Sequence, residues 1–90
     1  MKAIDFSPKV FKKLQFIRKN NKKLYKKIIK QLDLFQENPT HKSLRLHKIN
    51  RKKGENIWSI SIDKGYRMLY LEDGTIYFFD IGTHDEVYRK

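Results

Sequence analysis

The spacing of the apolar residues changes once along this sequence, near Pro39, and that change limits the folds it can adopt. Before Pro39 the apolar residues recur every three or four positions, which is typical of amphipathic helices. After Pro39 they alternate with polar residues, which is typical of strands that bury one face. Helices followed by strands indicate an α+β fold, and 90 residues indicate one domain spanning residues 1–90.

The first half of the chain predicts a short strand and two helices. Residues 2–7 alternate between polar and apolar and predict the strand. Ser7 is placed to cap a helix, and Pro8 follows at the first helical position, where its missing N–H costs nothing. Residues 20–21, both Asn, separate this helix from a second one over residues 22–37, so the pair predicts a helical hairpin.

The second half predicts an antiparallel meander of three to four strands. Residues 41–49 fit either a strand or an extended lead-in, and residues 57–63 alternate cleanly. Residues 66–71 and 75–81 predict a hairpin, because Asp-Gly between apolar runs is a strong turn signal. The last strand is apolar on both faces, which predicts a central, covered position. We expect the helices to cover one face of the sheet and to leave the polar, basic face open.

The charge of the chain is strongly positive and unevenly distributed. The formal net charge is +11, and residues 6–30 carry nine Lys and one Arg without an acid. Such a field favours a polyanionic partner, either a nucleic acid, an acidic protein or an anionic membrane surface. The alternative is that these lysines only solvate helix faces, whose apolar stripes are needed for the core.

The sequence lacks several features that particular classes of protein require. The chain has no Cys, which excludes disulfides and thiolate chemistry and fits a reducing cytoplasm. Its start lacks the apolar segment of a signal peptide, and no apolar run reaches membrane-spanning length. The three His lack the spacing of a zinc motif, and the four Gly are isolated. We therefore expect a cytoplasmic protein with no membrane partner, no metal and no cofactor.

The C-terminal stretch DIGTHDEVYRK concentrates residues that can do acid–base chemistry. His84 follows the last predicted strand and can exchange a proton near neutral pH, with Asp85 and Glu86 placed to tune it. Arg67, on the neighbouring predicted strand, offers a fixed charge and a forked donor for phosphate. Tyr88 offers a ring that can stack on a base and a hydroxyl that can relay a proton.

If these side chains converge, they could cleave RNA without a metal, because the nucleophile lies within the substrate. One group would deprotonate the ribose 2′-OH, Arg67 would stabilise the phosphate, and another group would protonate the leaving 5′-oxygen. Each residue also has a plainer interpretation. Arg67 could pair with Asp80 on the adjacent strand. His84 could be an exposed loop residue, and Tyr88 could cover an edge of the core.

A basic segment before the predicted meander is a candidate RNA-binding surface. Its side chains could contact phosphates, which would supply affinity and salt dependence without sequence information. The alternative is an ordinary solvated loop. The candidate RNA-binding residues are Arg45, His47, Lys48, Arg51, Lys52 and Lys53.

The words GYRMLY and DIGTHDEVY, at this distance and after a strand and two helices, resemble the RelE/ParE superfamily of type II toxin–antitoxin toxins. The tail most resembles the YafQ-like members. The resemblance covers nearly the whole chain. It implies a metal-independent endoribonuclease that cuts mRNA on the ribosome, with Arg67, His84 and Tyr88 as catalytic residues. It also implies a cognate antitoxin, and a toxin–antitoxin hetero-oligomer able to bind operator DNA.

The chain departs from this resemblance at Ser59 and Ser61. Many ribonuclease members carry Lys or Arg on the strand before the Tyr-Arg strand, where this chain has Ser59 and Ser61. Lys48, Lys52 or Lys53 could substitute for them, and His41 or His47 could match a further histidine of YafQ-like members. The superfamily also contains gyrase inhibitors that do not cleave RNA. A gyrase-inhibiting toxin and a non-catalytic RNA-binding module are therefore the alternatives.

Overall fold

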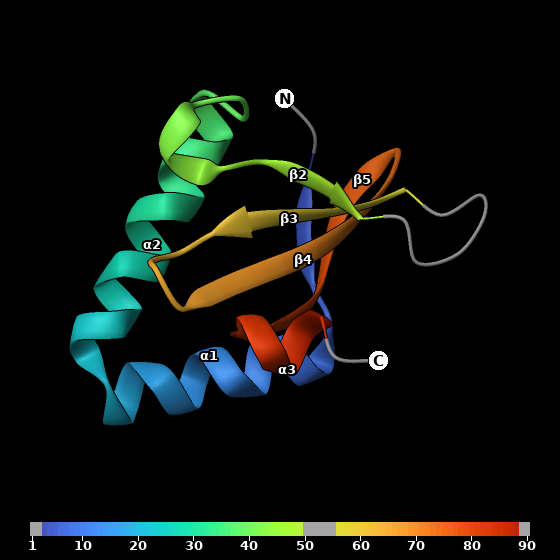
Figure 1. Ribbon diagram of the computed structural model, residues 1–90. Coiled ribbons are helices and arrows are strands. Elements are labelled where there is room, and N and C mark those ends of the chain that lie inside the picture. Colours follow the sequence, from blue (N-terminus) through green and yellow to red (C-terminus); the bar gives the residue numbers. More distant parts are fainter. Residues whose placement is uncertain (1–2, 50–55, 89–90) are drawn as a thin grey trace.

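The computed structural model describes residues 3–49 and 56–88, which form a mixed five-stranded sheet with two long helices and a short C-terminal one (Figure 1). The elements in chain order are β1 (Ile4–Phe6), α1 (Pro8–Asn20), α2 (Lys22–Glu37), the 3₁₀ turn η1 (Lys42–Leu44), β2 (His47–Ile49), β3 (Ile57–Ser61), β4 (Tyr66–Asp73), β5 (Thr75–Thr83) and α3 (His84–Tyr88). The α+β fold class is confirmed.

The two long helices begin at the capping residues that the sequence predicts. The hydroxyl of Ser7 accepts a hydrogen bond from the backbone N–H of Val10 at 3.1 Å, and Pro8 opens α1. Asn21 ends α1 and caps α2, where its side-chain oxygen accepts from the N–H of Leu24 at 3.1 Å. One residue therefore joins the helices, which meet at an open corner and do not run antiparallel (Figure 1).

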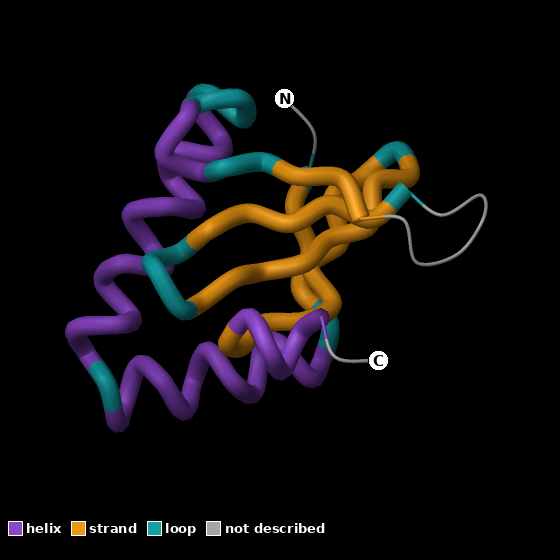
Figure 2. Tube along the Cα trace, in the orientation of Figure 1, coloured by secondary structure: helices purple, strands orange, loops and turns teal. Residues whose placement is uncertain are grey.

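The strand order is β1-β5-β4-β3-β2. Strands β2 to β5 form the predicted antiparallel meander, and Figure 2 shows β2, β3 and β4 side by side. Strand β1 pairs in parallel with β5, with Ile4 opposite Ile76, after the chain crosses over through α1 and α2. This pairing, which the sequence analysis did not foresee, makes the sheet mixed. It also places β5 inside the sheet, as expected for its apolar sequence.

The core lies between the helices and one face of the sheet. Phe78 of β5 is fully buried, and its ring lies 5.3 Å from that of Tyr70 on β4 and 5.9 Å from that of Phe35 on α2. Ile60 of β3 and Met68 of β4 are opposite each other in register and join the same core. The helices therefore cover one face of the sheet, as expected, and the alternation of residues 57–63 places Ile60 and Ile62 on that face.

The opposite face of the sheet is only partly open, so the expectation of a wholly open face is wrong. Helix α3 packs on β4 and β5, and the hydroxyl of Tyr88 reaches Ser59 on β3. Ser59, Leu69 and Val87 are consequently fully buried. The cause is local, because the chain turns back on the sheet directly after β5. No helix in the described part of the chain is long and apolar enough to cross a membrane.

Candidate functional site

Strand β4 places Arg67 on the face that α3 partly covers. Arg67 lies opposite Ser61 of β3 and Gly82 of β5, and its side chain is half-buried. Asp80, the partner considered for Arg67 in the sequence, lies opposite Leu69 and pairs with Lys9 of α1 at 3.1 Å. The Arg67–Asp80 pairing is therefore wrong. Among the described residues no hydrogen bond or ion pair engages the guanidinium of Arg67, so its donors remain available to an anion.

A capping box explains why the chain turns at Thr83 and presents His84. The carboxylate of Glu86 accepts from the N–H of Thr83 at 2.8 Å, and the N–H of Glu86 donates to the Thr83 hydroxyl at 3.3 Å. The hydrogen bonds from Thr83 lower the pKa of the Glu86 carboxyl. A Cβ at Gly82 would lie 2.7 Å from Oε1 of Glu86, so any larger residue there would displace this carboxylate. The Glu86 carboxylate is therefore hydrogen-bonded to the backbone of Thr83. Of the two acids next to His84 in the sequence, Asp85 is the one whose carboxylate lies near the imidazole.

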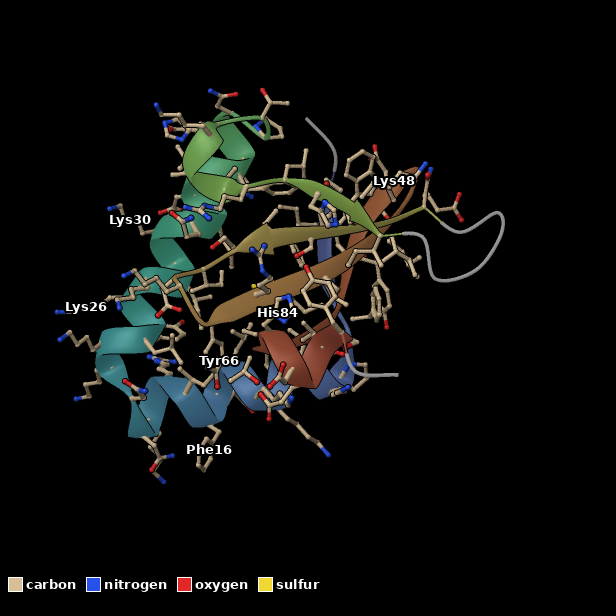
Figure 3. The ribbon with its side chains drawn as sticks, in the orientation of Figure 1. Phe16, Lys26, Lys30, Lys48, Tyr66 and His84 are labelled. Carbon is tan, nitrogen blue, oxygen red and sulfur yellow. The ribbon has the colours of Figure 1, made fainter. Side chains whose placement is uncertain are left out.

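His84 and Tyr88 lie on the same side of α3, one turn apart. Their ring centroids are 4.4 Å apart, and the hydroxyl of Tyr88 donates to Oγ of the buried Ser59 at 2.7 Å. The side chain of His84 remains 64% exposed, with Nδ1 3.8 Å from the carboxylate of Asp85. Figure 3 shows His84 over β4 at the start of α3. Ser59 therefore fixes Tyr88, and Tyr88 supports one side of the His84 ring.

Arg67, His84 and Tyr88 line one cavity of about 480 Å³, which we call the catalytic pocket after the role predicted for these three residues. The three residues predicted as catalytic thus converge. Arg45 and His47 line the same cavity from the opposite side. His47 lies on the edge strand β2 directly opposite Ser59, so it projects onto the same face of the sheet. Besides Arg67 and His84, the basic groups at this pocket are Arg45 at the end of η1 and His47 on β2, whereas Ser59 and Ser61 occupy β3.

The backbone of Arg45 is left-handed, with φ 47° and ψ 49°, which is uncommon for a residue with a side chain. Arg45 ends η1, and its N–H donates to the carbonyl of Lys42 at 3.1 Å. This conformation costs about 1–2 kcal/mol in a non-glycine residue. It turns the chain from η1 into β2 and leaves the Arg45 side chain at the mouth of the pocket.

Other candidates lie apart from the catalytic pocket. Lys48 faces the other side of the sheet, where its Nζ is 5.8 Å from the ring centroid of Trp58. Nδ1 of His41 accepts from the N–H of Ser43 at 3.1 Å and caps η1. The predicted RNA-binding residues Arg51, Lys52 and Lys53 lie outside the described residues.

Two features of this site were not predicted from the sequence. The first is the capping box, although the motif T-x-x-E at residues 83–86 was a readable signal. The second is the role of Ser59 as the anchor of Tyr88, for which 29 residues of sequence separation gave no signal. Within residues 3–49 and 56–88 no group of three or more His, Cys, Asp and Glu side chains could hold a metal ion.

The chemistry available in the catalytic pocket is that of phosphate and proton transfer. Arg45 and Arg67 offer guanidinium donors for a phosphate, and His47 and His84 offer two titratable imidazoles. The Tyr88 ring offers a surface that could stack on a base. A single-stranded nucleic acid presents both a phosphate and a base to such a pocket.

The sequence matches the family model described as the ParE toxin of type II toxin-antitoxin system, parDE, over residues 4–88. The chain is also 34% identical to the candidate toxin RelE4 of Methanocaldococcus jannaschii, over 100% of this chain and 94% of the relative. Both matches extend through the pocket residues of β4 and α3.

Solved structures give the same fold. The YoeB dimer from Staphylococcus aureus matches with a TM-score of 0.72 and 25% identity, over 92% of this chain and 97% of that one. YafQ from Escherichia coli matches with a TM-score of 0.74 at 20% identity, over 98% of this chain and 99% of that one. A complex of YoeB with YefM from S. aureus matches with a TM-score of 0.72 and 26% identity, over 93% and 98% of the two chains. The chain therefore belongs to the RelE/ParE superfamily, as a ParE-family toxin of a type II toxin–antitoxin system.

Proposed function

We propose that this toxin is a metal-independent endoribonuclease that cleaves mRNA on the ribosome and so inhibits translation. The observation that carries the proposal is the convergence of Arg67, His84 and Tyr88 on one open pocket. A toxin that acts only by binding another protein does not need an exposed imidazole in the same pocket as a guanidinium that no described residue engages.

The proposed reaction is an internal transesterification within the RNA. The ribose 2′-oxygen attacks the adjacent phosphorus after a base removes its proton, and the bond from phosphorus to the 5′-oxygen breaks. An acid then gives a proton to that 5′-oxygen, which leaves a 2′,3′-cyclic phosphate and a 5′-hydroxyl. The two proton transfers require two groups in opposite protonation states, and His84 and His47 line the same pocket.

Each pocket residue has a proposed role in this reaction. Arg67 stabilises the charge that develops on the phosphate, which is the effect that a preorganised donor provides best. His84 transfers a proton as general acid or base. Tyr88 stacks on a base and supports the His84 ring, because its own hydroxyl proton is engaged by Ser59.

The cellular setting is part of the same proposal. The solved structures include YoeB with YefM and a DinJ–YafQ toxin–antitoxin complex, which supports a cognate antitoxin for this chain. We expect that antitoxin to block the catalytic pocket, and the hetero-oligomer to bind operator DNA. A cytoplasmic location follows from an mRNA substrate.

The test is RNA-end mapping after brief induction of the chain without antitoxin. A variant with Arg67→Ala and His84→Ala is compared with a matched control carrying Arg18→Ala and His41→Asn. Arg18 is exposed on α1, and Asn at position 41 retains a side-chain acceptor for the η1 cap. We expect new 5′ ends within coding regions, in register with codons, for wild type and control but not for the pocket variant.

Three outcomes would contradict the proposal in different ways. New ends that ignore codon register would indicate a ribonuclease that acts on free RNA. Growth arrest without new ends, together with DNA damage, would favour a gyrase inhibitor of the same fold. RNA binding without arrest or new ends would indicate a non-catalytic module.

A further inference from the structure

A second basic groove adjoins the catalytic pocket. It has a volume of about 530 Å³ and lies between α2, η1 and the turn from β3 to β4. Arg45 and Arg67 line both cavities, so the two cavities adjoin at these residues. A strand that leaves the catalytic pocket past the two arginines therefore enters this groove.

The groove is strongly cationic. Five basic side chains and one carboxylate line it; they are Lys27, Lys30, Arg45, Lys64, Arg67 and Asp63. Burial would raise the pKa of Asp63, but hydrogen bonds from the N–H groups of Gly65 and Tyr66, with Lys27, outweigh it and lower the pKa. Both N–H bonds to Oδ1 are 2.9 Å long, and Lys27 is 3.4 Å from Oδ2. The one carboxylate among these lining residues is thus hydrogen-bonded within the β3–β4 turn.

One buried side chain holds the elements around the groove together by hydrogen bonds. Gln31 of α2 is buried, and its amide donates to the carbonyl of Ser61 at 2.8 Å and to that of Ser43 at 3.4 Å. One side chain therefore ties α2 to both β3 and η1. The backbone elements that carry the cationic groups are therefore held in a fixed relation, which reduces the entropy lost on binding.

The lining also differs in kind from that of the catalytic pocket. None of the ten described residues around the groove is aromatic, whereas the catalytic pocket has the rings of His47, His84 and Tyr88. Without a ring to stack on a base, lysines and serines recognise the sugar–phosphate backbone. The groove thus fits a phosphate chain irrespective of base sequence.

We infer that this groove, which we call the flanking groove, binds the phosphates of the substrate strand next to the scissile one. The inference rests on the proposed ribonuclease function and extends it to the length of RNA that the toxin grips. The catalytic pocket holds one base and the scissile phosphate. The flanking groove supplies sequence-independent affinity and the direction in which the strand runs.

The test compares two triple variants of equal net charge. The groove variant carries Lys27→Gln, Lys30→Gln and Lys64→Gln, and the control carries Lys22→Gln, Lys23→Gln and Lys26→Gln. The control lysines are exposed on α2 outside both cavities, and Lys26 projects away from the sheet (Figure 3). Binding is measured by anisotropy with 2′-O-methylated RNA of three and eight nucleotides, which lacks the nucleophile, over a range of salt concentrations.

We expect wild type and control to bind the eight-nucleotide RNA much more tightly than the three-nucleotide RNA. The groove variant should lose this length advantage, by about tenfold in affinity at moderate salt. Its slope of log affinity against log salt should fall by about two, since each lost phosphate contact removes about 0.7. Thermal melts of both variants that match wild type would show that the loss is local.

Equal losses in both triple variants would overturn the inference, because the grip would then come from diffuse charge. A second pattern would also overturn it. If both variants keep the length dependence but the groove variant binds ribosomes more weakly, the groove binds ribosomal RNA and not the substrate strand. Failure of the proposed function is distinct from these results. In that case ribosome-bound mRNA stays intact with wild type and with every variant, while the binding difference persists.

Discussion

The two faces of strands β3 and β4 use alternate residues of the same sequence for opposite purposes. On one face Ile60 and Met68 pack under the helices and leave no exposed surface. On the other face Ser61 and Arg67, also opposite each other in register, line cavities open to solvent. The first face determines whether the chain folds, and the second determines what it can bind. Substitutions on the two faces should therefore separate stability from activity.

The largest expected effect is on the core face. Phe78→Ala removes a fully buried ring that contacts three other aromatic rings, and should lower the free energy of unfolding by about 3–5 kcal/mol. Tyr77→Ala is the control, because Tyr77 is the residue next to Phe78 and its side chain is 37% exposed on the other side of β5. Urea unfolding measures both. An equal cost for the two changes would contradict the assignment of the core to one face.

The next effect is on the site face and should spare stability. Arg67→Ala removes the proposed phosphate donor and should reduce RNA cleavage by about 10²–10³-fold. Its free energy of unfolding should change by less than about 0.5 kcal/mol, because no described residue depends on its guanidinium. A loss of activity that merely tracks a loss of folded protein in urea unfolding would contradict this prediction.

A smaller effect tests how the site is held in place. Ser59→Ala and Tyr88→Phe each break the 2.7 Å bond between the two hydroxyls, at a cost of about 0.5–1.5 kcal/mol. If Tyr88 acts by positioning His84, each change should lower the cleavage rate several-fold. The double variant should then be no worse than either single one. Fully additive losses would show that the two hydroxyls act independently.

The smallest effect concerns the capping box. Because the pKa of Glu86 is lowered in the folded chain, its charge stabilises the fold above the ordinary pKa of a glutamate. That contribution is lost as the pH falls through the folded pKa. Glu86→Gln should thus lower the Tm at neutral pH and match wild type in strong acid. The carboxylate is exposed to solvent, so the difference should stay below about 0.5 kcal/mol. A Tm difference that persists in acid would contradict the role of the charge.

Much of the fold could be predicted from local signals. Ser7 and Asn21 fixed the helix boundaries, and the Asp-Gly turn fixed the last hairpin, because caps and turns depend on neighbouring residues. The parallel pairing of β1 with β5 could not be predicted in the same way. It joins residues more than 70 positions apart, and hydrophobic periodicity carries no information on partners at that distance.

The candidate site was predictable in its residue types but not in its assembly. The chemistry of Arg67, His84 and Tyr88 and the family resemblance both predict them as site residues, and the structure brings them together. His47 and Lys48 looked equivalent in the sequence, yet adjacent residues of a strand face opposite sides, so only His47 reaches the pocket. The sequence does not show which lysines line the flanking groove and which face solvent elsewhere. That depends on where the β3–β4 turn lies against α2, which is a tertiary contact.

The most direct test of the account is cleavage by the purified chain of mRNA bound to ribosomes, with the ends of the products identified chemically. His84→Asn is compared with His41→Asn, which makes the same change at an exposed histidine outside the pocket. We predict that wild type and His41→Asn produce 2′,3′-cyclic phosphate and 5′-hydroxyl ends in the ribosome-bound message, and that His84→Asn cuts at least about 100-fold more slowly. Equal cleavage by both variants, or no cleavage by wild type, would contradict the assignment of this pocket as a ribonuclease site.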